Sequence, residues 1–330
     1  MREGPVAATL RISGLKVSVG PYSVVDGVDL EIEEGEIVAL VGESGSGKSL
    51  TALSLMGLLA GRVRQTEGEV ELNGRPIDTA DNVEMNGLRG TSMSMIFQEP
   101  VASLNPLLSV GAQVAESLIV HGRATPAEAW KRAIQMLADV GIPEPEKRAR
   151  QFAAELSGGM CQRVMIASAL IAQPDLLIAD EPTTALDVTV QAQILDLIRR
   201  LRDETGTSVL IITHDMGVVA SIADRVCVMY GGRVVEQAEV HQLFKTPRHP
   251  YTKLLLATIP KLTDAPKQEL YSIKGTVPDI SGWPEGCRFR TRCPLADAQC
   301  VHTPPMVPVG ADSDEGLVAC WHHDKTEALL

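Results

Sequence analysis

The chain has 330 residues, of which 45% are apolar, enough for a sizeable core in one large domain or two smaller ones. Its formal net charge is −12, and because an acidic surface repels a phosphate backbone, composition disfavours a nucleic-acid partner. No run of about 18 apolar residues occurs and no secretory signal is evident, so we expect a chain that works in the cytosol without itself crossing a membrane.

The N-terminal third predicts strands around one helix. The segment VDLEIEEGEIVALVG alternates, turns at Gly35 and continues as an apolar run, which is typical of two strands joined by a tight turn. KSLTALSLMGLL, starting at Lys48, has the spacing of a helix. GEVELNG and MSMIFQ are typical of further strands.

A glycine-rich loop lies between the apolar strand and that helix. GESGSGKS, residues 42–49, fits G-x-x-x-x-G-K-[ST], and the strand before and helix after it argue against a chance glycine-rich turn. Backbone N–H groups of such a loop surround phosphates, Lys48 supplies a charge to the β- and γ-phosphates, and the Ser49 hydroxyl is a ligand for Mg²⁺. The predicted nucleotide contacts are Gly42, Glu43, Ser44, Gly45, Ser46, Gly47, Lys48, Ser49 and Leu50.

Residues from about 103 to 172 are mostly helical in pattern, for example AEAWKRAIQMLADVG, which ends at Gly141. The apolar runs DLLIAD, SVLIIT and DRVCVMY then alternate with helices such as TVQAQILDLIRRLRDE, which indicates a largely parallel sheet in an α/β domain. After about residue 258 prolines and turn residues become frequent. We therefore predict a nucleotide-binding domain over 1–257 and a loop-rich tail over 258–330.

Two carboxylates end one of these strands, in LLIADEP at residues 176–182. Asp180 lies where a strand delivers a ligand to Mg²⁺, and Glu181 points elsewhere because successive strand side chains alternate. Glu181 is then available as the general base for an attacking water. Taken alone the pair would suit capping or solvated acids as well, and the phosphate loop is what favours the catalytic interpretation.

Four further motifs narrow the choice among nucleotide hydrolases: LSGGMCQR at 156–163, Gln98 in IFQEP, Asp187 in TTALD and His214 in IITHD. With the phosphate loop and the carboxylate strand, they resemble the ATP-binding subunit of ABC transporters over residues 10–257. The resemblance implies a phosphate-loop α/β domain with a parallel-sheet core, an antiparallel β edge subdomain and an inserted helical subdomain. It also implies ATP and Mg²⁺ as cofactors.

The same resemblance assigns roles to the remaining polar residues. It implies that Gln98 contacts Mg²⁺ and water, so that Ser49, Gln98 and Asp180 form the Mg²⁺ site. It implies further that Glu181 polarises water and that His214 holds the γ-phosphate. A lone histidine after an apolar strand is more often structural, and here the surrounding ITHD pattern favours the catalytic role.

The LSGGM segment implies a dimer. In the family that is resembled, two subunits pair head to tail, ATP lies between the phosphate loop of one and this segment of the other, and Asp187 lies across the interface. Ser157, Gly158 and Gly159 begin a predicted helix, and an open helix start with small residues binds anions, although Ser157 also suits a simple cap. Cys161 stands where such subunits often have an arginine, and we interpret it as a packed thiol.

A second departure from the family pattern concerns the nucleobase. Such subunits usually place an aromatic residue before the second strand, where it stacks on adenine. By spacing, that position falls at Val19, and Tyr22, three residues on, is the candidate substitute. Cys227, in DRVCVMY, is predicted to lie in the strand core.

The tail contains the pattern Cys287-x₅-Cys293-x₆-Cys300-x₁₉-Cys320. A secreted chain would use these residues for disulfides, but reduced thiols are expected in the cytosol. Four thiolates can hold zinc or an iron–sulfur cluster, and the absence of C-x₂-C pairs disfavours zinc without excluding it. His322 and His323 are alternative ligands beside Cys320. A small core filled by bare cysteines fits poorly with polar, proline-rich flanks.

FKTPRHPYTKLLLATIP, IKGTVPD and the cysteine-bearing tail resemble the oligopeptide and dipeptide subfamily of ABC importers, over residues 244–322. In some members this four-cysteine tail holds a [4Fe–4S] cluster, which we expect here in a structural role, with zinc as the alternative. The resemblance implies a motor at the cytoplasmic face of the inner membrane. Its implied partners are a second ATP-binding subunit, a different chain being favoured over an identical one, two membrane permeases and, indirectly, an extracytoplasmic substrate-binding protein.

Two other functions stay open at this stage. The same motor can serve another ligand, such as nickel or a glycoside, because the transported substrate never touches this subunit. A soluble ABC ATPase acting on ribosomes or DNA is disfavoured by the single nucleotide domain, the lack of sustained heptads and the acidic charge.

Overall fold

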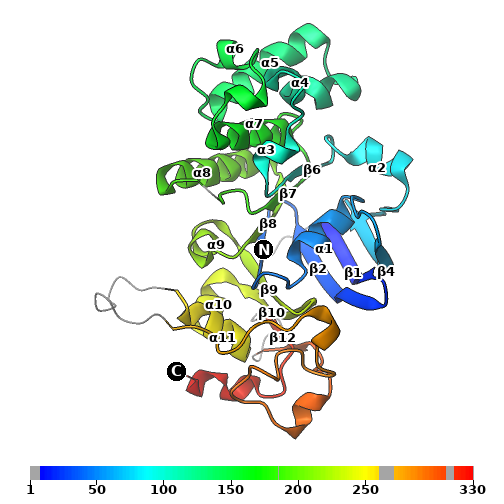
Figure 1. Cartoon of the computed structure of the whole chain (residues 1–330), viewed down its shortest axis with the longest axis vertical. Helices are drawn as coiled ribbons and strands as arrows, with labels where there is room; N and C mark the ends of the chain where they lie inside the picture. The colour runs from blue at the N-terminus through cyan, green and yellow to red at the C-terminus, as the bar shows by residue number, and fades with distance from the viewer. Residues whose placement is uncertain (1–7, 185, 260–270, 310–315, 330) are drawn as a thin grey trace, which may run out of the picture.

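The computed structural model describes residues 8–184, 186–259, 271–309 and 316–329 (Figure 1). The chain begins with a four-stranded antiparallel sheet of order β2-β1-β4-β5. Apolar side chains alternate along these strands. They pack against one face of the central sheet and form a hydrophobic core with it. The strands are β1 (Ala8–Val19), β2 (Tyr22–Glu33), β4 (Val63–Leu72) and β5 (Arg75–Pro76).

A second, eight-stranded sheet runs through the centre, in the order β11-β12-β10-β9-β3-β8-β7-β6. Its members β9, β3, β8, β7 and β6 are parallel, while β10 and β12 are antiparallel to their neighbours. Strands β3, β7 and β8 are buried along their whole length, which explains their unbroken apolar sequences. The bounds are β3 (Ile37–Val41), β6 (Met93–Ile96), β7 (Leu176–Asp180), β8 (Ser208–Thr213), β9 (Arg225–Tyr230), β10 (Arg233–Glu239), β11 (Val307–Pro308) and β12 (Leu317–Val318).

The two strands expected on either side of Gly35 both form, but they belong to different sheets. β2 ends at Glu33 in the antiparallel sheet, and β3 begins at Ile37 in the central one. Gly35 has a φ of 68°, a conformation that glycine adopts without steric cost, so the chain can change sheets within three residues. This turn brings the end of β3, and the phosphate loop after it, to the centre of the molecule.

Helices between β6 and β7 form the upper part of Figure 1, as the pattern over 103–172 predicts. In this group α4 packs against α5 and α7. α5 begins with a capping box between Thr125 and Glu128 and has Pro126 in its first turn, and the chain reverses at Gly141, where φ is 76°. The members are α3 (Pro100–Ser103), α4 (Val110–Val120), α5 (Pro126–Asp139), α6 (Pro145–Arg148), η1 (Ala153–Glu155) and α7 (Gly158–Leu170).

The remaining helices surround the two sheets. Helix α1 begins at Lys48 as expected but ends at Leu55, four residues before the end of its apolar pattern. No helix of the described residues is both long enough and apolar enough to cross a membrane. The bounds are α1 (Lys48–Leu55), α2 (Asn82–Leu88), α8 (Val188–Thr205), α9 (Met216–Ile222), α10 (Val240–Lys245) and α11 (Pro250–Ala257).

The tail packs on the body of the protein. Its strand β12 pairs with β10 and extends the central sheet, which no sequence pattern predicted. Phe289 is buried against Tyr230 and Tyr251, with ring centroids 5.0 and 5.3 Å apart. Apart from β11 and β12, the described part of the tail consists of loops and the short 3₁₀ turns η2 (Ile280–Gly282), η3 (Ala298–Val301) and η5 (His323–Ala328).

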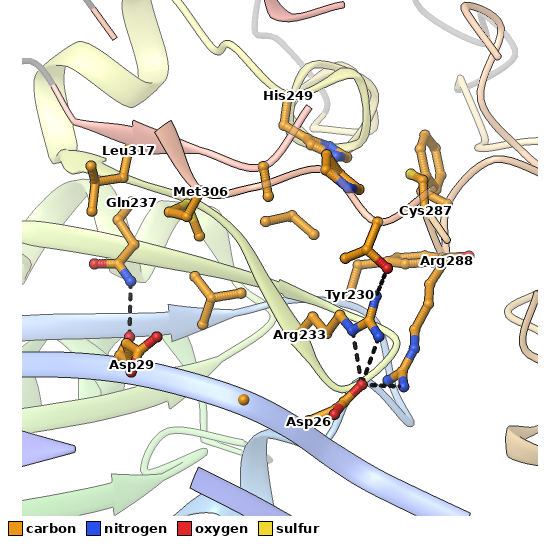
Figure 2. A pocket seen from close by; sticks show the side chains of 17 residues that line it. Asp26, Asp29, Tyr230, Arg233, Gln237, His249, Cys287, Arg288, Met306 and Leu317 are labelled. Atoms are coloured by element: carbon orange, nitrogen blue, oxygen red, sulfur yellow. Dashed lines mark hydrogen bonds and ion pairs between the residues drawn. The ribbon is translucent and has the colours of Figure 1, made fainter. Parts of the chain in front are cut away.

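Ion pairs add to this contact. Figure 2 shows Arg233 of β10 and Arg288 of the tail converging on Asp26 of β2, with nitrogen–oxygen distances of 2.7 Å for both ion pairs. Burial and the neighbouring Arg233 lower the pKa of Arg288 to about 10, and Asp26 opposes that shift. The three residues line a cavity of about 580 Å³ between the antiparallel sheet, β10 and the tail.

Candidate nucleotide-binding site

The phosphate loop connects the centre of the sheet to α1. Three of its glycines have positive φ: 155° at Gly42, 80° at Gly45 and 103° at Gly47. At Gly42 a side chain is also excluded by space, because a Cβ there would lie 2.1 Å from the carbonyl oxygen of Met229. These constraints explain the glycines of the motif. Gly47 caps α1 without a side chain, which leaves the first N–H groups of that helix open to an anion.

Lys48 is held inside this loop. Its Nζ donates to the carbonyl oxygens of Gly42, at 2.7 Å, and Glu43, at 3.0 Å, and lies 3.4 Å from the Ser46 hydroxyl. Burial lowers the pKa of Lys48, and nearby carboxylates, Glu181 foremost, oppose that shift. The ammonium group is therefore held inside the loop by two carbonyl oxygens.

Asp180 ends β7 beside the start of α1. It is 4% exposed, its Oδ1 has no hydrogen-bond partner among the residues that the structure describes, and the Ser49 hydroxyl contacts the carboxylate. Burial raises the pKa of Asp180, while the Ser49 hydrogen bond and Lys48 act in the opposite direction. A buried carboxylate oxygen without a partner, next to a hydroxyl, is the hard oxygen donor set that Mg²⁺ takes. The residues present therefore fit a Mg²⁺ ion.

The Glu181 carboxylate forms hydrogen bonds with three side chains from different parts of the chain. Its Oε1 lies 2.9 Å from Nδ1 of His214, and its Oε2 accepts hydrogen bonds from Thr184, at 2.8 Å, and Gln98, at 3.2 Å. Burial opposes ionisation, but the hydrogen bonds from His214 and Thr184 outweigh it and lower the pKa of Glu181. The backbone of Glu181 has a φ of 50°, which is unusual for a residue other than glycine.

Lys48, Glu181 and His214 face one cavity of about 790 Å³. Four residues of the predicted phosphate loop and Mg²⁺ site do not line it: Gly42, Glu43, Ser46 and Asp180. Its walls are formed by residues 44–50 except Ser46, together with Gln98, Glu181 and His214. Sequence reasoning missed two other walls, Val24 of β2 and, from the tail, residues 277–280 with Trp283. Neither Tyr22 nor Val19 lines the cavity, and Tyr22 is 42% exposed at the turn between β1 and β2.

The LSGGM segment does not line this cavity of its own chain. Ser157 caps α7 by accepting the backbone N–H of Met160, and Gly158 is exposed beside it. Asp187 caps α8 by accepting the N–H of Val190. Cys161 is buried and burial raises its pKa, in agreement with a packed thiol. Burial likewise raises the pKa of Cys227, in β9, to about 12.

The four tail cysteines are free thiols, and Cys320 lies near the other three. Burial first, and then the neighbouring thiols of Cys287, Cys293 and Cys300, raise the pKa of Cys320 to about 12, although a backbone N–H bonded to its sulfur opposes the shift. Backbone N–H groups also donate to the sulfurs of Cys287 and Cys293. Hydrogen bonds of this kind stabilise sulfur ligands of metal clusters, so the donor set fits such a group.

One tighter set of possible ligands lies in the same region. Donor atoms of Asp297, Cys300 and His322 all lie within 4.8 Å of one another, and Nε2 of His322 is 3.1 Å from Oδ1 of Asp297. Among the described residues, this is the set of three or more acidic, cysteine or histidine side chains compact enough for a single metal ion. Of the two histidines suggested beside Cys320, His322 is the one that joins it.

Comparisons with known proteins agree with this geometry. The model of the family "ABC transporter" matches residues 25–184, and that of "Oligopeptide/dipeptide transporter, C-terminal region" matches residues 235–300. The chain is 45% identical over 321 residues to the dipeptide transport ATP-binding protein DppD of Bacillus subtilis (strain 168), covering 96% of this chain and 95% of that protein. The chain belongs to the ABC transporter ATP-binding proteins.

Further relatives support this assignment. The oligopeptide transport ATP-binding protein OppD of Bacillus subtilis (strain 168) is 46% identical over 324 residues, 96% of this chain and 89% of that protein. Among solved structures, the bacterial ABC transporter cassette MJ0796, described as dimeric, superposes with a TM-score of 0.64 at 31% identity. That match covers 70% of this chain and 98% of the other. As an ABC transporter ATP-binding protein, the chain has the expected α/β cassette fold and is an ATPase.

Proposed function

We propose that the chain is the ATP-hydrolysing motor of an ABC importer for oligopeptides or dipeptides. One observation carries the proposal. The same chain has the nucleotide cavity and a C-terminal region, residues 235–300, that matches the oligopeptide/dipeptide transporter model. The named transport substrates of the relatives, dipeptides and oligopeptides, support the same choice.

In the proposed mechanism residues 42–50, Lys48 among them, hold the triphosphate. Ser49, Gln98 and Asp180 would hold Mg²⁺, and the ion would draw negative charge from the phosphates. Glu181 stays ionised because its hydrogen bonds lower its pKa, and it accepts a proton from the attacking water. His214 donates to the Glu181 carboxylate through Nδ1–H. A phosphate oxygen only accepts hydrogen bonds, so His214 binds the γ-phosphate through Nε2–H as an imidazolium, with a proton on both ring nitrogens.

A second ATP-binding subunit completes the site in this proposal. Ser157, Gly158 and Gly159 lie at the start of α7, outside the cavity of their own chain, so they are available to a nucleotide held by another subunit. Asp187 would face the same interface, and the dimer of MJ0796 supports the arrangement. We favour a different chain over an identical copy as partner, as the subfamily resemblance implies.

The permeases would bind near Gln98 and the helical segment 103–172. Three apolar side chains lie exposed just after Gln98: Val101, Leu107 and Leu108, of which Leu107 is 82% exposed. An exposed apolar cluster next to the catalytic glutamine suits a surface that receives a helix from a membrane subunit. The motor would then lie at the cytoplasmic face of the inner membrane and reach the extracytoplasmic substrate-binding protein only through the permeases.

We also propose that the tail is a distinct functional part, residues 258–330 beside an ATP-binding domain of residues 1–257, and that Cys287, Cys293, Cys300 and Cys320 hold a [4Fe–4S] cluster. The mutual approach of the thiols and their backbone N–H donors support this choice. Zinc is the alternative, and the close set of Asp297, Cys300 and His322 is what favours it.

Uptake of labelled peptides tests the transport function. Cells that lack the chromosomal gene receive either the wild-type chain or Glu181→Gln, and uptake of labelled dipeptides, oligopeptides, nickel and a glycoside is compared. The proposal expects peptide uptake to return only with the wild-type chain. Restoration of nickel or glycoside uptake, with none for peptides, would contradict the peptide assignment while leaving the motor role.

A further inference from the structure

The tail forms one wall of the nucleotide cavity. Residues 277–280 and Trp283 line it, and the turn η2 between them packs against β2, whose Val24 lines the same cavity. Lys48 and Glu181 mark the end of the cavity that holds the γ-phosphate. The wall made by β2 and the tail is therefore left for the rest of the nucleotide, the ribose and the base.

Trp283 is held rigidly in this wall. Its Nε1 donates to the carbonyl oxygen of Pro278 at 3.0 Å, and the guanidinium carbon of Arg288 lies 4.2 Å from the centroid of the indole ring. Arg288 is itself fixed by Asp26, at 2.7 Å, and by the carbonyl oxygen of Gly231. The cation occupies one face of the indole, so a base that stacks on Trp283 must take the opposite face.

Among the described residues, Trp283 is the one tryptophan, tyrosine or phenylalanine that lines the cavity. Val24 is aliphatic, and the aromatic side chain of Tyr22 lies outside the cavity. Stacking on an aromatic ring contributes roughly 1–3 kcal/mol per base in nucleic-acid systems, as judged by replacing the aromatic residue with alanine. The cavity thus has one surface suited to stacking a purine, and the C-terminal tail supplies it.

We propose that Trp283 stacks on the nucleobase of ATP, so that the tail is part of the nucleotide site. The inference rests on the proposed position of the triphosphate in residues 42–50. It makes Trp283 a binding residue whose contact is to the base alone, while Arg288 and Pro278 position it.

Binding of two ligands separates base contacts from phosphate contacts. Affinities for Mg²⁺–ATP and for Mg²⁺–tripolyphosphate, which has no base, are measured by calorimetry on the full-length wild-type chain, Trp283→Phe, Trp283→Ala and Tyr22→Ala. We expect Trp283→Ala to weaken ATP binding by roughly 5- to 150-fold, the range of one stacked base, with the tripolyphosphate affinity unchanged. Trp283→Phe should retain most of the ATP affinity, and Tyr22→Ala should match the wild type.

Fluorescence gives a second readout that does not depend on the alanine variant being well folded. The chain has three tryptophans, and replacing Trp130 and Trp321 by phenylalanine leaves Trp283 as the single emitter. ATP should then change its emission, and tripolyphosphate should not.

Two results would overturn the inference: Trp283→Ala binding ATP as the wild type does, or equal losses for ATP and tripolyphosphate, which would indicate a structural role. Tripolyphosphate that fails to compete with ATP on the wild-type chain would instead contradict the proposed phosphate site.

Discussion

The guanidinium of Arg292, in the tail, binds both carboxylate oxygens of Glu43 in the phosphate loop, at 2.6 and 3.0 Å. The Arg292 side chain is 4% exposed and also donates to the carbonyl oxygens of Lys274 and Gly275. Burial opposes its charge, but Glu43 outweighs burial and raises the pKa of Arg292. Since Glu43 N donates to the Tyr251 hydroxyl at 2.8 Å, the loop is held from two sides.

Arg292→Ala should therefore lower both the affinity for the nucleotide and the free energy of unfolding. The variant leaves Glu43 without its partner, and loss of a partner to a charged group costs about 1–3 kcal/mol. We expect a lower ATP affinity and a lower free energy of unfolding in urea, while Arg292→Lys, which keeps the charge but not the fork, lies between. Lys274→Ala removes an exposed cation from the same segment and should change neither value. Unchanged ATP affinity in Arg292→Ala would contradict a role for the pair.

Glu181→Gln should bind ATP and fail to turn it over. The amide cannot accept the proton of the attacking water, and a general base contributes about 10²- to 10⁴-fold to the rate. The Glu181 side chain makes its hydrogen bonds to Gln98, Thr184 and His214 and not to the phosphate loop, so ATP affinity should stay near the wild-type value. Lys48→Ala should show the opposite behaviour, because it removes a phosphate contact and should therefore weaken ATP binding itself. Steady-state hydrolysis by Glu181→Gln at the wild-type rate would show that another group is the base.

Iron content distinguishes the proposed cluster from its alternatives. Protein purified without oxygen should be brown and contain about four irons per chain. Cys293→Ser and Cys320→Ser should lose the colour and the iron, while Cys161→Ser, a change at a buried thiol of α7, should keep both. A colourless wild-type preparation with one zinc per chain would contradict the cluster and support the zinc alternative.

His249 predicts how stability depends on pH. It is fully buried, and burial lowers its pKa from 6.5 to about 3, while in the unfolded chain it has its ordinary pKa. Below pH 6.5 the unfolded state therefore binds a proton at His249, whereas the folded state does not bind it until the pH approaches 3. The free energy of unfolding consequently falls as the pH drops from 6.5 toward 3, by up to about 1.4 kcal/mol per pH unit. His249→Asn, which can still cap α11, should flatten the difference between urea unfolding at pH 7.5 and at pH 5.5. Equal pH slopes in the two proteins would contradict this.

The central motifs were predictable because they are local. The phosphate loop, with a buried strand before it and a helix after it, carries its geometry in eight consecutive residues. The roles of Gln98, Glu181 and His214 were predicted through the family resemblance. The structure brings the three side chains together because each comes after a strand of the parallel sheet and such strands end at one edge.

The part played by the tail was not predictable. Arg292 and Glu43 are 249 positions apart, and β12 has two residues, so neither contact leaves a periodic pattern. Trp283 lies in a loop-rich stretch in which the cysteines are the recognisable sequence pattern. Its position in the nucleotide cavity depends on tertiary packing of the tail against β2, which local propensity does not encode.

The most direct test concerns the second subunit. The rate of ATP hydrolysis per chain is measured over a hundredfold range of protein concentration, for the wild type and for Ser157→Arg, with the second ATP-binding subunit added where two different subunits pair. A site shared between subunits predicts a rate per chain that rises with concentration, by mass action, and falls to background in Ser157→Arg. A rate per chain that stays constant on dilution, and that Ser157→Arg leaves at the wild-type level, would contradict the account.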